Sequence, residues 1–323
     1  FHHHVVLHIM TNIFKHHNLS KFEIYGFSHG KIKDDDLRKK IKPYFKKFFI
    51  INDMSDTKVV KLTRDMEIDM AINLTGLTNN ERSGIFLKRV APIQINYLGY
   101  PGTTAIKSMD YIIADKTIIP EKEKKYYTEK VKYMPECYIS EPNDLLLKFT
   151  KNFSRSDFDL PENNIIFCAI HNPLKITPEI FDVWTRILKK VKGSVLWVNF
   201  IDEYSKKNLL AELKKKNLGP ERIIFAGRLK ESGDHLKRLE LADIFLDTYP
   251  YNSHSTSFDY INAGLPMVTL KGSSFASRVA SSIYSSIDMD ELIANNILEY
   301  ENIAVELAND KSKLNKVKSK VLI

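Results

Sequence analysis

The chain has 323 residues and a mass of 37.4 kDa, more than one hydrophobic core usually spans, so its length predicts two domains. Its two cysteines, Cys137 and Cys168, are too few for a disulfide scaffold or a cysteine-rich metal finger. Hydrophobic residues make up 43% and charged residues 27%, and no apolar run reaches about 18 residues. The composition therefore excludes bulk disorder and a membrane-spanning helix, and we expect a soluble globular protein.

The formal net charge is +8, from 48 basic and 40 acidic residues. The lysines are scattered over predicted helix faces without the basic-aromatic interleaving of nucleic-acid-binding modules, so we expect neither a nucleic-acid nor a membrane partner. Two thiols and no visible signal peptide predict a cytoplasmic location. Because the sequence begins with Phe1 rather than methionine, an upstream segment with targeting information stays an open alternative.

Short β-branched and aromatic runs alternate with longer amphipathic runs, a pattern typical of βα units that build a parallel sheet. In the first half this pattern predicts a helix at 81–90 and strands at 22–27, 68–73, 92–98 and 111–114. Residues 140–163 contain Pro142 and Pro161 and show little periodicity. They predict an interdomain connection.

A second series of the same kind follows this connection. It predicts strands at 165–170, 195–199, 223–225, 244–247 and 267–270, and helices at 178–190, 204–217, 234–241, 255–263 and 275–282. The predicted fold class is α/β, with two doubly wound Rossmann-like domains at 1–140 and 164–323 and a linker at 141–163. Ligands of such sheets bind outside the carboxyl ends of the strands, so chemistry is expected in the loops that follow them.

The most informative segment is LDTYPYNSHSTSFDYINAGLPMVTL, residues 246–270. A buried strand ends there, a turn-rich loop follows, and Ser255 begins a helix that Gly264 and Pro266 terminate. His254, Ser255 and Thr256 are thus predicted at a helix N-terminus, where backbone N–H groups, the helix dipole and two hydroxyls suit a phosphate or diphosphate. Asp259, one turn further, could accept hydrogen bonds from ribose. The alternative is a capping box formed by Thr256 with Asp259, or by Ser255 with its neighbours.

The same segment, with SSFASRVASS at 273–282, resembles the catalytic region of the O-linked N-acetylglucosamine transferase and SPINDLY family. Further matches run in order along the chain: APIQINYLGYPGTT at 91–104, MDYIIAD from Met109, EKVKYMP ending at Pro135, and PLKITPEIFDVWTRILKKVKGSVLW at 173–197. The resemblance implies a GT-B architecture, in which two Rossmann-like domains face a cleft that holds a nucleotide sugar.

Carried over to this sequence, the family's pattern implies a role for each matching residue. His254 would contact the nucleoside, Ser255 and Thr256 the diphosphate, and Asp259 the ribose. Residues expected to complete the nucleotide-sugar site are His235 on the base side, Tyr251 beside the diphosphate, and Asn172 and Lys175 in the loop after the first strand of the second domain. Lys175 is the predicted catalytic residue of this loop, because an ammonium beside the leaving diphosphate stabilises charge that grows in the transition state.

The resemblance also places residues of the first domain near the sugar and the acceptor. His4 is the second predicted catalytic residue, either as a general base or as an orienting group; alternatively, His2, His3 and His4 form a metal-binding run of low complexity. The residues expected against the sugar are Thr78, Leu98, Gly99 and Pro101.

The implied activity is inverting transfer of N-acetylglucosamine from UDP-GlcNAc to serine and threonine hydroxyls of proteins. Asp288 and Asp290 satisfy an Asp-x-Asp metal pattern, but Asp290 begins a predicted helix, so helix capping explains it better. We therefore expect no metal and no cofactor. Two alternatives stay open: a protein O-fucosyltransferase that uses GDP-fucose, as the SPINDLY resemblance implies, and a catalytically silent scaffold of the same fold. Expected partners are the nucleotide sugar, protein or peptide acceptors, and upstream tetratricopeptide repeats.

Overall fold

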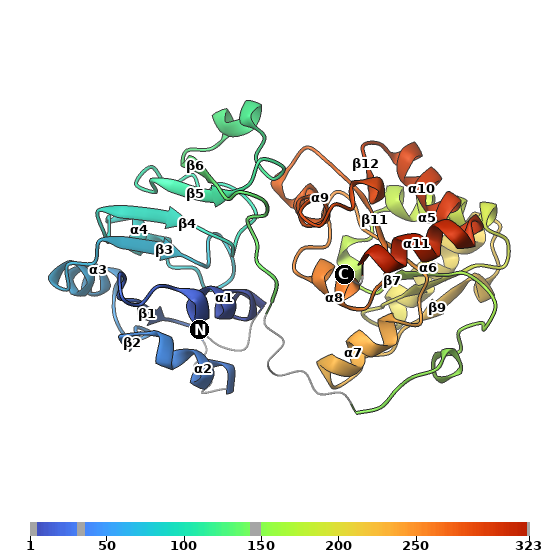
Figure 1. Ribbon diagram of the computed structural model, residues 1–323, viewed down its shortest axis with the longest axis horizontal. Helices are drawn as coiled ribbons and strands as arrows, with labels where there is room; N and C mark the ends of the chain where they lie inside the picture. Colours follow the sequence, from blue (N-terminus) through green and yellow to red (C-terminus); the bar gives the residue numbers. More distant parts are fainter. Residues whose placement is uncertain (1–4, 31–35, 143–149, 322–323) are drawn as a thin grey trace. The chain divides into compact units, whose positions relative to one another are not determined.

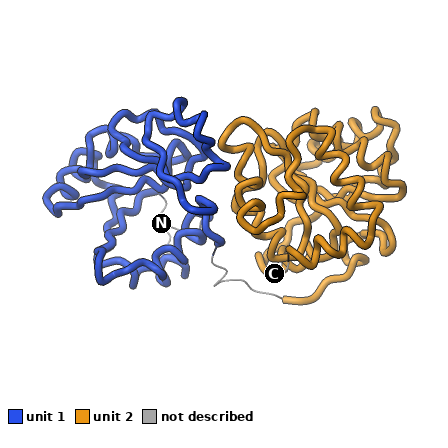
Figure 2. The backbone as a smooth tube through the Cα atoms, turned by 45° about the horizontal axis from the view of Figure 1, so that its top comes forward, with its two compact units in different colours: residues 1–146 blue, residues 147–323 orange. Residues whose placement is uncertain are grey.

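The computed structural model describes residues 5–30, 36–142 and 150–321, in two compact units of residues 1–146 and 147–323 (Figure 2). The division between the units falls within the predicted connection. Predicted His4 lies outside the described residues. Each unit contains parallel β-sheet with helices.

The first unit contains two parallel sheets (Figure 1). One pairs β1 (Tyr25–Ser28) with β2 (Lys47–Ile50). The other has the order β3-β4-β5-β6, with strands at Met70–Asn73, Ile93–Asn96, Tyr111–Ala114 and Lys130–Tyr133. The helices of this unit are α1 (Val5–His16), α2 (Asp36–Ile41), α3 (Asp56–Asp65) and α4 (Ser83–Leu87).

Helices α3 and α4 join the two sheets of the first unit through one apolar cluster. Buried residues of and around these helices, Val59, Val60, Ile85 and Val90 with Ile51, pack against Phe27 of β1, Phe49 of β2 and Ala71 of β3. The opposite face of β3 carries Met70 and Ile72, each 46% exposed. The four-stranded sheet therefore buries one face more fully than the other.

The second unit is built on a six-stranded parallel sheet with the order β12-β11-β10-β7-β8-β9. Its strands are Ile166–Ala169 (β7), Val195–Val198 (β8), Ile223–Phe225 (β9), Ile244–Leu246 (β10), Met267–Leu270 (β11) and Ile293–Ala294 (β12). Its helices are Pro178–Lys190 (α5), Glu203–Lys215 (α6), Ser232–Leu239 (α7), Thr256–Asn262 (α8), Val279–Ser285 (α9), Ile297–Asn309 (α10) and Lys311–Val321 (α11). Helix α10 packs against α5, α11 and the β10–β12 side of the sheet (Figure 1).

The four strands β7, β8, β10 and β11 are buried along their whole length, as expected for a parallel sheet covered on both faces. Trp184 of α5 and Trp197 of β8 are fully buried in this core. The Nε1 of Trp184 donates to the hydroxyl of Tyr300 at 3.1 Å, which ties α5 to α10. Buried aromatic side chains of this size contribute about 2–3 kcal/mol each.

The strand predictions at 111–114, 223–225 and 267–270 and the helix prediction at 178–190 match the observed bounds, and the other predicted elements are present with shifted ends. The predicted helix at 275–282 is a 3-10 helix, Phe275–Ser277, followed by α9. Elements without a prediction are α1, α2, α3, β2, β6, β12, α10 and α11.

Part of the predicted linker is folded onto the second unit. Arg155–Phe158 forms a 3-10 helix in which Arg155 pairs with Asp243 at 3.0 Å, and the Phe158 ring lies 5.3 Å from that of Trp197. The backbone N–H of Thr150 also donates to Asp234 of α7 at 2.7 Å. The prolines and weak periodicity of this segment predict a linker. Its packing could not be predicted from the segment itself, because the residues that it contacts lie far along the chain.

Candidate functional site

The candidate site lies where the chain order of the second sheet reverses. Strands β7 and β10 are neighbours at the centre; β8 and β9 continue to one side, and β11 and β12 to the other. At such a point the loops after the two central strands leave in opposite directions, which opens a ligand-binding crevice at the carboxyl edge of the sheet. The loop after β7 carries Asn172 and Lys175, and the loop after β10 carries Tyr251 to Ser255.

The structure brings predicted Lys175 and the loop after β10 together. The Nζ of Lys175 donates to the carbonyl oxygen of Asn252 at 2.9 Å and lies 4.5 Å from the centre of the Tyr251 ring. Burial lowers the pKa of Lys175 from its usual value, and the negative charge of Asp247 opposes that shift. The two segments are 77 residues apart, so only the fold creates this contact.

Tyr251 and His254 form a stacked pair on the same loop. Their ring centres are 4.5 Å apart with an interplanar angle of 19°, and the Nδ1 of His254 lies 3.4 Å from the Tyr251 hydroxyl. The Nε2 of His254 faces the carbonyl oxygen of Ala276 at 3.1 Å. Because a carbonyl only accepts, this nitrogen carries the proton. Burial, with the charge of Lys175, lowers the pKa of His254 to about 3, so the ring is neutral at pH 7.

Helix α8 begins at Thr256, one residue later than predicted. Ser255 makes no side-chain capping bond to α8, so it does not form the capping box considered as an alternative. The N–H groups of Ser257 and Phe258 donate to the carbonyls of His254 and Ser255 at 2.8 and 3.2 Å. A diphosphate would therefore meet the exposed Thr256 and part-exposed Ser255 rather than those two amides.

His235 and Asp259 lie on two helices that are in contact, α7 and α8. The Nδ1 of His235 accepts a hydrogen bond from the Nε of Arg238 at 3.0 Å. Burial, with the charge of Arg238, lowers the pKa of His235 to about 4, so this ring is also neutral at pH 7. Asp259 is part-exposed on α8.

Predicted Asn172 has a local structural role in the loop after β7. Its Oδ1 accepts from the backbone N–H of Leu174 at 3.1 Å, and it caps the 3-10 helix Pro173–Lys175. This cap starts the turn that ends with Lys175. The contact with a nucleotide stays a prediction.

The first-domain residues lie on two adjacent loops at the carboxyl edge of the four-stranded sheet. Thr78 follows β3, and its hydroxyl donates to the carbonyl of Thr75 at 2.9 Å. Leu98, Gly99 and Pro101 follow the neighbouring strand β4. A Cβ on Gly99 would lie 2.0 Å from the carbonyl oxygen of Leu74, so glycine is required where these loops meet. Leu98 has a positive φ of 74°.

Sequence reasoning missed three buried polar residues in the segments after β7 and β10 that carry Lys175 and His254: Asp247, Asn252 and His171. Asp247 and His171 each directly follow the apolar run of a central strand, a position where a polar side chain is itself a signal. The Nδ1 of His171 lies 3.3 Å from the carbonyl oxygen of Asn172. Burial lowers the pKa of His171 to about 3.

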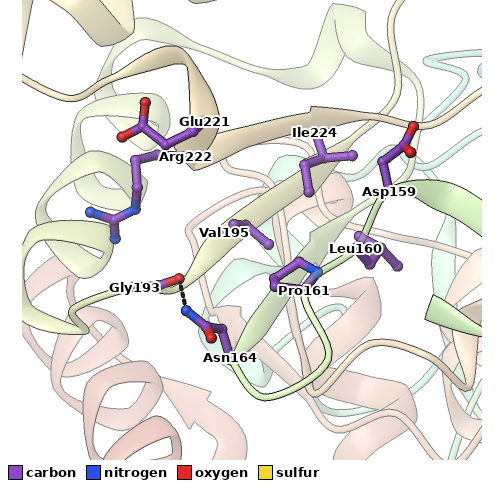
Figure 3. Close-up of a pocket in the computed structure, with 9 residues that line it drawn as sticks. All are labelled: Asp159, Leu160, Pro161, Asn164, Gly193, Val195, Glu221, Arg222 and Ile224. Atoms are coloured by element: carbon purple, nitrogen blue, oxygen red, sulfur yellow. Dashed lines mark hydrogen bonds between the residues drawn. The ribbon is translucent and has the colours of Figure 1, made fainter. Parts of the chain in front are cut away.

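A hollow of about 510 Å³ occurs elsewhere in the second unit (Figure 3). Asn164, Gly193 and Arg222 line it at the amino ends of β7, β8 and β9, the edge opposite the loops described above. The Arg222 guanidinium donates to the carbonyls of Leu188, Val191 and Ser194. Its donors hold the backbone together, so this hollow is a weaker candidate than the β7–β10 edge.

Among the residues that the structure describes, no three His, Cys, Asp or Glu side chains are grouped so that they could hold a metal ion. Asp290 begins the 3-10 helix Asp290–Leu292, and its Oδ1 accepts from Ser285 Oγ at 2.5 Å. No helix in the described ranges is long and apolar enough to cross a bilayer.

Two Rossmann-like units with parallel sheets, and polar side chains on the loops at the switch point of the second, are typical of the GT-B class of glycosyltransferase folds. The structure superposes on a mutant O-GlcNAc transferase of Thermobaculum terrenum with a TM-score of 0.90 at 24% identity, over 99% of this chain and 60% of that one. It also superposes on HepE of Anabaena, solved with UDP and glucose, with a TM-score of 0.58 at 11% identity, over 98% of this chain and 89% of that one. At these identities the likeness concerns the fold.

The chain belongs to glycosyl transferase family 41, which matches residues 1–152 and 140–323. It is 33% identical over 319 residues to the probable UDP-N-acetylglucosamine–peptide N-acetylglucosaminyltransferase SEC of Arabidopsis thaliana, covering 97% of this chain and 32% of that protein. It is 29% identical over 314 residues to the SPINDLY protein of the same plant, which carries the same enzyme description, covering 94% of this chain and 33% of that protein. The chain thus spans about a third of the length of these relatives.

Proposed function

We propose that this chain is the catalytic region of an inverting protein O-glycosyltransferase that moves N-acetylglucosamine from UDP-GlcNAc to serine or threonine hydroxyls. Family membership and the descriptions of the SEC and SPINDLY relatives support this class of reaction. The observation that carries the proposal is the position of Lys175. Its ammonium lies against the Tyr251–His254 loop at the switch point of the second sheet.

In the proposed reaction, the acceptor oxygen attacks the anomeric carbon from the side opposite UDP. The bond from that carbon to the diphosphate oxygen breaks, and the acceptor proton leaves to water or to His4. Negative charge then grows on the diphosphate, where Lys175 stabilises it more in the transition state than in the ground state. The neutral rings of His254 and His235 suit contacts with an uncharged nucleoside rather than with the diphosphate.

The proposal includes no metal ion, because Lys175 and the hydroxyls of Ser255 and Thr256 would supply the positive and hydrogen-bonding groups that a diphosphate needs. The family resemblance implies a further part of the proposal, preceding tetratricopeptide repeats. A cytoplasmic location, expected from the two thiols of the chain, is also part of it. The resemblance also implies the contacts of Asn172, Tyr251 and Asp259 with the nucleotide sugar, and of Thr78, Leu98, Gly99 and Pro101 with the sugar.

Calorimetric titration of UDP in the presence of EDTA tests the proposal. We expect saturable binding that is the same with and without chelator. Absence of UDP binding, or binding that EDTA abolishes, would contradict it. Parallel titration with GDP distinguishes UDP-GlcNAc from GDP-fucose as the donor, since tighter binding of GDP than of UDP would favour GDP-fucose. Mass spectrometry of a lysate incubated with each nucleotide sugar would identify the sugar transferred.

A further inference from the structure

We propose that Asp247 is a positioning residue of this site, whose buried carboxylate orders the loop after β10 and acts as the counter-charge that keeps Lys175 an ammonium. The residue lies directly after Leu246, the last residue of β10, and is 0% exposed. The inference deepens the proposed function and rests on it for the identity of the bound anion.

The Asp247 carboxylate fixes both ends of the loop. Its Oδ1 accepts from the backbone N–H of Thr248 at 2.9 Å and from that of Ser253 at 2.7 Å. Its Oδ2 accepts from the hydroxyl of Thr269 on the neighbouring strand β11 at 2.7 Å. The loop from Thr248 to Ser253 is therefore closed on itself and attached to the sheet through one side chain.

This closure sets the position of the group that receives Lys175. Asn252 immediately precedes Ser253, and its carbonyl oxygen accepts the Lys175 ammonium at 2.9 Å. Inside the loop, Asn252 Nδ2 donates to the Thr248 carbonyl at 2.9 Å, and the Thr248 hydroxyl donates to the Tyr251 carbonyl at 2.7 Å. A shift at Asp247 would thus move both the carbonyl and the Tyr251 ring against which Lys175 rests.

The hydrogen bonds of Asp247 favour its ionised form. Two of its three partners are backbone N–H groups, which donate and cannot accept, so they stabilise the carboxylate and not a protonated carboxyl. Burial raises the pKa of Asp247, whereas the bonds from Thr269 and Ser253 and the charge of Lys175 oppose that rise. A carboxylate with these partners is a counter-ion that the protein holds in place.

Among the residues that the structure describes, the other titratable groups whose pKa shifts involve Lys175 or Asp247 are uncharged at pH 7. Burial and the positive charge of Lys175 lower the pKa of His171 and of His254 to about 3. Burial and the negative charge of Asp247 both raise the pKa of three tyrosines, Tyr260, Tyr284 and Tyr300. The charge balance of this part of the site is therefore set by Lys175 and Asp247.

The test is Asp247→Asn, which keeps the size of the side chain and the acceptor for two N–H groups but removes the charge. Trace acetylation of Lys175, followed by mass spectrometry across a pH series, reports its titration without any nucleotide. We expect the pKa of Lys175 to fall by about one unit or more relative to wild type. The alkaline limit of UDP binding should move to lower pH by the same amount, because only the ammonium attracts the diphosphate.

Asp243→Asn is the matched control, since Asp243 lies at the other end of β10 and pairs with Arg155 and Lys318. It should lower stability and leave the Lys175 titration unchanged. If Asp247→Asn does not fold, Thr269→Val removes one hydrogen bond from the carboxylate and should lower the pKa of Lys175 by a smaller amount. An unchanged Lys175 titration in the folded variant would overturn the inference. Wild-type protein that does not bind UDP would overturn the proposed function instead, while the acetylation result still decides the role of Asp247.

Discussion

The Nζ of Lys175 donates to the carbonyl oxygen of Asn252 at 2.9 Å, which joins the loops after the two central strands of the second sheet. The ammonium is thus held by the protein before any ligand binds. Electrostatic groups that are fixed in advance cost no reorganisation during the reaction and contribute most to the rate.

Lys175→Ala should therefore lower the rate of sugar transfer by about 10²- to 10³-fold. UDP affinity should fall less than the rate, because the lysine acts mainly on charge that develops in the transition state. The measurement is kcat with a peptide acceptor beside calorimetric titration of UDP. Lys192→Ala, at an exposed lysine of the same unit, should leave both unchanged. If folded wild-type protein and Lys175→Ala both gave only background transfer, the silent scaffold would be favoured.

The Tyr251 ring contacts both the Lys175 ammonium and the His254 ring, so it should position both. Tyr251→Ala removes a cation–π contact of about 1 kcal/mol and should weaken UDP binding about fivefold. Tyr251→Phe keeps the ring and should retain near wild-type affinity. If Tyr251→Phe weakened UDP binding as much as Tyr251→Ala, the hydroxyl rather than the ring would be the important group.

The elements best predicted from sequence are those whose signal is local. Helix α5 has Thr177 as N-cap, Pro178 at its first position and a strong apolar stripe, and its observed bounds match the prediction. The helix N-terminus pattern predicts His254, Ser255 and Thr256, whereas only the family resemblance predicts Asn172, Lys175 and Tyr251. The fold places Lys175 against Tyr251 and Asn252.

A strand depends on pairing with a distant segment, which is why β2 lacks a prediction. The strand β2 reads KFFI and has exposed ends, and its parallel pairing with β1 was not visible in its own residues. Asp247 was passed over for the same reason, since its partners Ser253 and Thr269 come together only when β10 and β11 pair.

Gly99→Ala should destabilise the first unit. The added Cβ would lie 2.0 Å from the Leu74 carbonyl oxygen, a backbone atom that cannot move without shifting the loop after β3. We expect a loss of about 2 kcal/mol in the free energy of unfolding, measured by urea denaturation. Gly102→Ala is the control in the same loop, because its Cβ would meet only the Tyr100 ring, at 3.3 Å, and should cost little. A similar loss in both variants would mean that the Leu74 contact is not the cause.

The second unit should lose stability as the pH falls from 7 to 4. His171 and His254 have a pKa of about 3 and His235 of about 4 in the folded protein, whereas an unfolded histidine has a pKa of about 6.5. Between these values the unfolded chain binds protons that the folded chain does not. Acid therefore favours unfolding, by up to about 1.4 kcal/mol per pH unit for each histidine.

His171→Phe tests this pH dependence at its most buried histidine. Phenylalanine keeps a ring against Trp184 and Phe245 but cannot take up a proton when the chain unfolds. Unfolding of this variant should therefore take up about one proton fewer than unfolding of wild type. The slope of the unfolding free energy against pH should be smaller by the corresponding amount. His16→Asn, at an exposed position of the first unit, should leave the slope for the second unit unchanged. The slope and not the absolute stability is compared, so any packing cost of the larger ring does not affect the result. A wild-type slope in His171→Phe would show that the His171 ring is already protonated in the folded wild-type protein.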